Sequence, residues 1–131
     1  MNLKIVSLTL TVAASLAAPA FAHHSFAMFD AEQTVTLNGT VKEFEWVNPH
    51  AWLRVMVNDE KTGRSAVWAL ELSSPSRLVT MGMHADSVKP GDAVSVTFHP
   101  LRNGSRGGQF LQAVLPGGQK VIRANARDEN D

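Results

Sequence analysis

Residues 44–57 read F-E-W-V-N-P-H-A-W-L-R-V-M-V, and the rest of the chain is organised around this stretch. Apolar residues on both sides predict two β-strands, with the polar turn Asn48-Pro49-His50 between them. Proline fixes its own φ and disfavours the helical conformation in the preceding residue, so we expect the chain to reverse direction here. The turn presents the imidazole of His50 beside two indoles, those of Trp46 and Trp52.

The first 22 residues have the pattern of a secretory signal peptide. Lys4 precedes an apolar segment over residues 5–18, and a small-x-small pattern ends at Ala22. This apolar run is shorter than the roughly 20 residues that a membrane-spanning helix needs, and the remaining sequence contains no other such run. We therefore expect an exported protein, periplasmic or secreted, that begins at His23. An uncleaved anchor is the alternative.

Composition excludes several classes of function. The chain has 12 basic and 12 acidic residues, and loss of Lys4 with the signal leaves a slight acidic excess. A nucleic-acid-binding protein normally carries a basic excess that contacts phosphates, so we expect no nucleic-acid partner. The chain contains no cysteine, which excludes disulfides, thiolate metal sites and a cysteine nucleophile.

The first strand, over residues 35–46, changes its apolar parity along its length. Val35, Leu37 and Val41 share one parity, whereas Phe44 and Trp46 have the other. A strand that keeps its apolar side inward must slip by one residue, so the pattern predicts a β-bulge between Val41 and Phe44. Two further alternating strands, over residues 51–58 and 65–72, are joined by a polar hairpin.

The pattern changes to that of a helix after the third strand. Ser74 and Pro75 suit the first positions of a short helix, in which Leu78, Val79 and Met81 form an apolar stripe. The methionines here are expected to pack into the core rather than to bind copper.

Two more strands complete the predicted domain. The motif Lys89-Pro90-Gly91-Asp92 predicts a type II turn before a fourth strand over residues 93–99. Residues 100–108 form a Gly/Arg-rich loop, expected to be too polar to bury, before a fifth strand over residues 110–115. The order predicts an all-β fold with one short helix, a small five-stranded OB-like barrel (β-β-β-α-β-β). We expect a cleaved signal peptide (1–22), an N-terminal arm (23–34), the barrel (35–123) and a disordered polar tail (124–131).

Five motifs together resemble those of a known family. They are A-H-H-S-F at residues 22–26, V-x-L-x-G-T-V-x-E-F at 35–44, W-V-N-P-H-A-W at 46–52, W-x-L-E at 68–71 and K-P-G-D at 89–92. The sequence resembles a small exported bacterial family of unknown function, and is DUF6152-like. The resemblance implies export and a compact β-rich domain, and it supplies no catalytic residues.

The histidines offer one route to metal binding. Cleavage after Ala22 would give His23 a free α-amine beside its imidazole, a pair that can chelate a metal, with His24 adjacent. Either His50 or His99 would complete a nitrogen set suited to Cu(II), similar to the histidine brace of copper proteins. His99 ends its strand on the outward parity, so we expect it to be exposed. The alternative is that His23 and His24 form a solvated chain end.

The first turn offers a second kind of site. Trp46, His50, Trp52 and Arg54 predict a binding face for a small molecule, a peptide or a periplasmic protein. Two alternatives stay open: His50 could serve only to brace the turn, and Trp52 could be covered by the arm or the helix.

No motif supplies a catalytic nucleophile together with its base. We therefore expect a non-enzymatic binding module. A copper-binding or copper-trafficking protein is the alternative, and a metal-dependent oxidoreductase on the same histidines is a third hypothesis.

Overall fold

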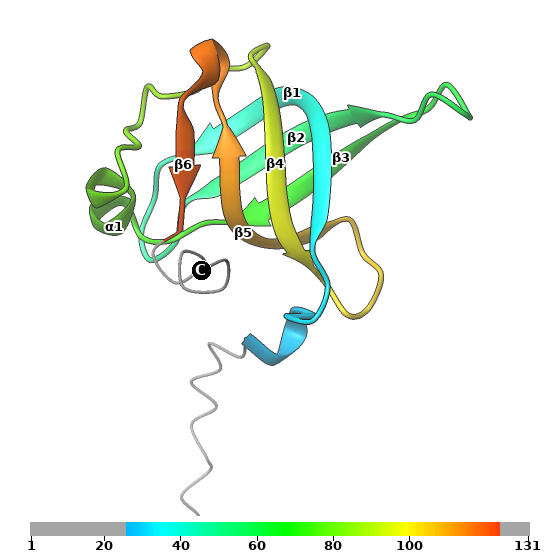
Figure 1. Ribbon diagram of the computed structural model, residues 1–131, viewed down its shortest axis with the longest axis horizontal. Coiled ribbons are helices and arrows are strands. Elements are labelled where there is room, and N and C mark those ends of the chain that lie inside the picture. Colours follow the sequence, from blue (N-terminus) through cyan, green and yellow to red (C-terminus); the bar gives the residue numbers. More distant parts are fainter. Residues whose placement is uncertain (1–25, 124–131) are drawn as a thin grey trace, which may run out of the picture.

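The computed structural model describes residues 26–123, which form a small β-barrel with one α-helix (Figure 1). A single turn of 3-10 helix, Phe26–Met28, precedes the barrel, and another, Pro116–Gly118, precedes its last strand. The remaining elements are β1 (Val35–Glu45), β2 (Trp52–Asn58), β3 (Ser65–Glu71), α1 (Pro75–Thr80), β4 (Ala93–Pro100), β5 (Gly107–Val114) and β6 (Lys120–Ile122).

The first five strands close on themselves. The sheet has the order β3-β2-β1-β4-β5-β6, and a further parallel pairing joins β3 to β5. This pairing turns an open sheet into a five-stranded barrel, with β6 added at the free edge of β5. The prediction of an OB-like barrel with its helix between the third and fourth strands is confirmed. Within residues 26–123, no helix has the length and apolarity needed to cross a membrane.

The long first strand belongs to both halves of the barrel. Its residues up to Thr40 pair with β4, whereas those from Thr40 onward pair with β2. The register with β2 shifts between Val41 and Glu43, which confirms the predicted β-bulge. The shift allows Val41 and Phe44 to point toward the same core although they differ in parity.

The core contains the inward residues that the alternating patterns predict. Leu53 and Leu70 are fully buried, as is Phe98, whose ring lies 5.6 Å from that of Trp68 between centroids. Leu78 of α1 is also fully buried, whereas Val79 of the predicted stripe is 47% exposed. Met83 lies buried in the core just after the helix, which confirms the structural interpretation of the methionines.

The loop predicted over residues 100–108 ends earlier than expected, because the strand that follows it begins at Gly107. Gly107 and Gly108 begin β5 and are buried, although we expected residues 100–108 to form an exposed loop. A Cβ atom on Gly107 would lie 2.8 Å from the Ala69 carbonyl oxygen of β3. Glycine is present because the two backbones approach too closely for a side chain, rather than because the segment is a flexible loop.

The turn between β2 and β3 is organised by an aspartate, which gives a pH prediction. The backbone N–H of Lys61 donates to Asp59 Oδ1 at 2.8 Å, and this bond, with others from Thr62, lowers the pKa of the carboxyl group below its ordinary value of 3.8. Because the folded pKa is depressed, the carboxylate stabilises the turn above pH 3.8, and this contribution is lost as the pH falls through the folded pKa.

We expect the Lys61 and Thr62 amide resonances to titrate with a midpoint below 3.8 in an NMR pH titration. Asp59→Asn should remove this transition while the barrel resonances elsewhere stay unchanged. A midpoint at or above 3.8 would show that these amides do not favour the ionised carboxyl group.

Candidate functional site

The histidine of the first turn is paired with a carboxylate of the third strand. His50 Nδ1 contacts Glu71 Oε1, and both side chains are partly buried. The pair forms because Glu71 lies directly opposite Trp52 in the β2–β3 register, two residues along the chain from His50. The backbone of Ala51 also bonds to the β3–α1 junction, donating to the Ser73 carbonyl at 3.1 Å and accepting from the Leu72 N–H at 2.9 Å.

A cleft of about 180 Å³ opens beside this pair. It lies at the end of the barrel that α1 covers, and chain segments distant in sequence meet there: the first turn, the β3–α1 junction, the start of β5 and the residue after β6 (Figure 1). We call it the first-turn cleft. Its lining residues are His50, Glu71, Leu72, Ser73, Ser74, Arg77, Gln109, Phe110 and Arg123.

Charged side chains line the first-turn cleft. Arg77 and Arg123 contribute two guanidinium groups, and Glu71 contributes the one carboxylate among the lining residues. That carboxylate is in contact with Nδ1 of His50. Backbone hydrogen bonding holds Arg123 in place, since its N–H donates to the Leu111 carbonyl at 2.7 Å. The exposed guanidinium of Arg77, beside a carboxylate already in contact with His50, favours an anion over a cation.

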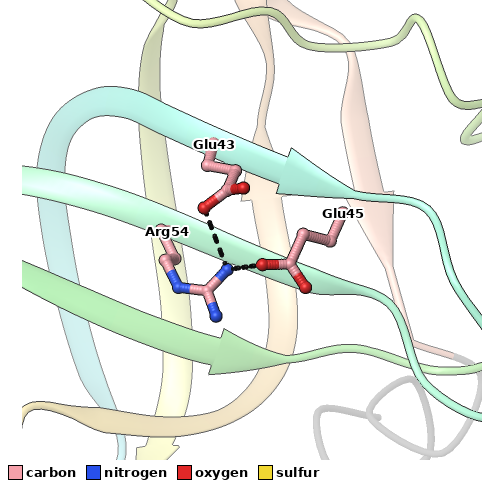
Figure 2. Close-up of polar contacts among 3 residues, drawn as sticks. All are labelled: Glu43, Glu45 and Arg54. Carbon is pink, nitrogen blue, oxygen red and sulfur yellow. Dashed lines mark hydrogen bonds and ion pairs between the residues drawn. The ribbon is translucent and has the colours of Figure 1, made fainter.

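Arg54 lies in a different environment from the one expected. Its Nη1 contacts Glu45 Oε1 and lies 3.1 Å from Glu43 Oε2, so one guanidinium bridges two carboxylates of β1 (Figure 2). The register explains the cluster, because Arg54 is opposite Glu43 and Trp52 is opposite Glu45. The guanidinium is thus already paired with acidic groups, which makes Arg54 a poor anion ligand for the predicted face.

The two tryptophans of the predicted face point to different sides of the sheet. Trp46 packs against the core and meets the Phe44 ring edge-on, with centroids 5.7 Å apart. Trp52 follows the outer parity of β2 and is half-buried, a result between the exposed and covered alternatives. Of the four residues predicted to bind a ligand, only His50 lines the first-turn cleft.

His99 is buried, so the expectation of an exposed side chain was wrong. Only 6% of its surface is exposed, and Nδ1 lies 2.8 Å from the Gln33 carbonyl oxygen. The outward parity was correct, but the arm before β1 folds over this part of β4. Phe29 forms a bridge with Leu101, and the Asp30 N–H donates to the Pro100 carbonyl at 2.8 Å.

His50 and His99, the candidate ligands that lie within the described residues, are not in contact with each other. Glu71 is opposite Gln109 across the β3–β5 pairing, and Gln109 is opposite His99 across β4–β5. Two strand spacings, about 10 Å, therefore separate the backbones of Glu71 and His99. His23 and His24 lie outside the described residues. Within residues 26–123, no three His, Asp, Glu or Cys side chains cluster closely enough to hold a metal ion.

Comparison with known proteins identifies the family. Residues 11–111 match the family of unknown function DUF6152. The chain belongs to this family. The DUF6152 match includes His50, Glu71, Arg77 and Gln109 of the first-turn cleft, and it ends before Arg123. No curated protein matches the sequence.

Several cleft residues were missed from sequence because they come together only in the folded barrel. Glu71 lies within the predicted third strand, but its pairing with His50 depends on the β2–β3 register. Arg77 carried no signal beyond its place in the short helix. Arg123 was assigned to the end of the barrel domain, and β6 brings it back beside β5.

Proposed function

We propose that this DUF6152 protein is an exported, non-enzymatic binding module that holds a small anion in the first-turn cleft. The observation that carries the proposal is the exposed guanidinium of Arg77 in a cleft whose single lining carboxylate, that of Glu71, is already in contact with His50. Arginine is suited to this role because its planar donors match the geometry of carboxylate and phosphate groups.

The size and walls of the cleft narrow the class of ligand. A volume of about 180 Å³ lies below the roughly 300–1,000 Å³ typical of sites for organic ligands, which suits a small carboxylate or phosphate rather than a cofactor. The Ser73 and Ser74 hydroxyls can donate to the ligand, as can the Gln109 amide. Leu72 and Phe110 are buried residues that contribute apolar surface to the lining. These features support a binding role.

The test is an NMR titration of residues 23–131 with inorganic phosphate and with malonate. We expect saturable amide shifts at His50, Ser73, Ser74 and Gln109 for at least one of the two anions. Arg77→Gln should weaken binding by about tenfold, because a charge-assisted hydrogen bond is lost. Arg77 is exposed on α1, so this change should leave the fold intact.

Arg102→Gln is the matched control, since Arg102 is an exposed arginine that lies 3.7 Å from Asp30 and does not line the first-turn cleft. It should bind the anion as the parent protein does. Absence of saturable shifts in the cleft for both anions, or equal binding by the Arg77→Gln protein, would overturn the proposal.

Export and copper binding are tested on the N-terminus itself. Mass spectrometry of exported protein should give His23 as the first residue. If the His23 amine chelates Cu(II), a protein beginning at His23 should bind it at least about tenfold more tightly than one with an extra preceding residue, since the extra residue removes the amine ligand. Equal affinity of the two forms would exclude a terminal chelate, and the anion proposal would be unaffected.

A further inference from the structure

A larger hollow, of about 510 Å³, lies at the end of the barrel where the β2–β3 hairpin projects. This hairpin extends away from the barrel on the side opposite α1 (Figure 1). The hollow shares no lining residue with the first-turn cleft. We call it the barrel mouth. Its apolar lining residues are Leu37 of β1, Val57 of β2, and Ala66 and Trp68 of β3.

The barrel mouth is open because the hairpin is longer than the strands beside it. β2 and β3 pair as far as Asn58 and Ser65, whereas β1 pairs with β2 only as far as Met56. On the other side, β5 pairs with β3 only from Ala69 onward. The inward-facing residues at the hairpin end of β2 and β3 therefore lie beyond the strands β1 and β5 that would otherwise cover them.

The residues at the barrel mouth have the parity of core residues without being fully buried. Leu37, Val57 and Trp68 pack against the core but keep part of their surface exposed. Trp68 forms the floor, since its ring lies against the fully buried Phe98. A half-exposed indole flanked by aliphatic side chains favours a flat apolar group. The volume lies within the 300–1,000 Å³ typical of sites for organic ligands.

The charged groups at the rim of the barrel mouth predict the charge of the ligand. Arg64 from the hairpin and Arg106 from the β4–β5 loop both line it, and within residues 26–123 neither guanidinium forms an ion pair. Asp59 is the one acidic lining residue, and its carboxylate accepts the turn amides of Lys61 and Thr62. The rim therefore has a net positive charge, and its single carboxylate is already hydrogen-bonded to backbone amides of the turn.

We propose that the barrel mouth binds a small amphipathic organic anion, with its ring or chain on Trp68 and its acid group at Arg64 and Arg106. The occupant is defined by charge complementarity at the rim and by the apolar floor. This site is independent of the anion cleft at the first turn, because the two lie at opposite ends of the barrel and use different residues.

The test uses 8-anilinonaphthalene-1-sulfonate, which combines aromatic rings with a sulfonate and fluoresces when shielded from water. We expect the folded protein to bind one equivalent with a Kd of about 10–100 μM. The double variant Arg64→Gln, Arg106→Gln should weaken binding by about tenfold, because both cations are removed from the rim. Arg102→Gln is the matched control and should bind as the parent does, since Arg102 does not line the barrel mouth.

A second variant tests the apolar floor. Ala66→Phe should fill the space above Trp68 and abolish binding, with near-UV circular dichroism confirming a native fold. Arg77→Gln, which removes a guanidinium of the first-turn cleft, should leave dye binding unchanged because Arg77 does not line the barrel mouth. The proposal is overturned if the protein does not bind the dye, or if both the Ala66→Phe and the double-arginine proteins bind it as tightly as the parent.

Discussion

Gly108→Ala is expected to lower the free energy of unfolding by about 3 kcal/mol. A Cβ atom at this position would overlap the His99 carbonyl oxygen and the Phe98 ring, and neither can withdraw. His99 belongs to the β4–β5 ladder and Phe98 is fully buried, so the two strands would have to separate. The direction of the change in stability shows whether the two strands are in close contact at this position. In an unstrained position without such a contact, glycine to alanine stabilises a protein by about 0.4–1 kcal/mol.

Urea unfolding followed by far-UV circular dichroism would measure this effect as a lower midpoint with an unchanged slope. Gln112→Ala is the control, because Gln112 is exposed on the same strand, and its stability should stay within about 0.5 kcal/mol of the parent. Gly107→Ala should also destabilise the protein, because its Cβ atom would lie 2.8 Å from the Ala69 carbonyl oxygen. A Gly108→Ala protein as stable as the parent would show that the strands are less closely packed than described.

Phe98→Ala should cost about 3–5 kcal/mol, which is a large part of the stability of a domain of this size. Phe98 is fully buried, lies opposite Phe110 across β4–β5 and contacts the Trp68 ring. Removing its ring would leave a cavity at the centre of the barrel that the paired strands cannot collapse to fill. It would also remove the support beneath the floor of the barrel mouth.

The same urea experiment applies, with Thr97→Ala as the control. Thr97 is the neighbouring residue on β4 and its hydroxyl bonds that of Thr36 at 2.9 Å, so its loss should cost only about 1 kcal/mol. Phe98→Leu provides a milder variant if Phe98→Ala does not fold. A cost below about 1 kcal/mol for Phe98→Ala would contradict its place in the core.

Strand positions were predictable because alternation reports directly which residues face the core. The parity change between Val41 and Phe44 even located the bulge in β1. Glycine was harder to interpret, since the same residue serves flexible turns and close strand contacts. Gly91, with φ of 95°, occupies the predicted turn, whereas Gly108 lies in a strand where two backbones meet. Spacing along the chain does not distinguish these cases.

The candidate sites were less predictable than the fold. His50 was found from its turn, but its partner Glu71 depends on strand register, and the arginines of the cleft come from α1 and from the residue after β6. Burial of His99 could not be predicted from its parity, because an outward residue is exposed only if no other segment covers it, and the arm does so here.

The amino-acid sequence by itself determined the succession of strands and helix along the chain, the bulge in β1 and the presence of an imidazole at the first turn. These features depend on residues that lie near one another in the chain. Only the tertiary structure decided that Glu71 faces His50, that Arg54 is held between two glutamates, and that the barrel is open at the hairpin end. These features arise where strands distant in sequence pair or fail to pair, and local patterns carry no information about which side chains meet across such pairings.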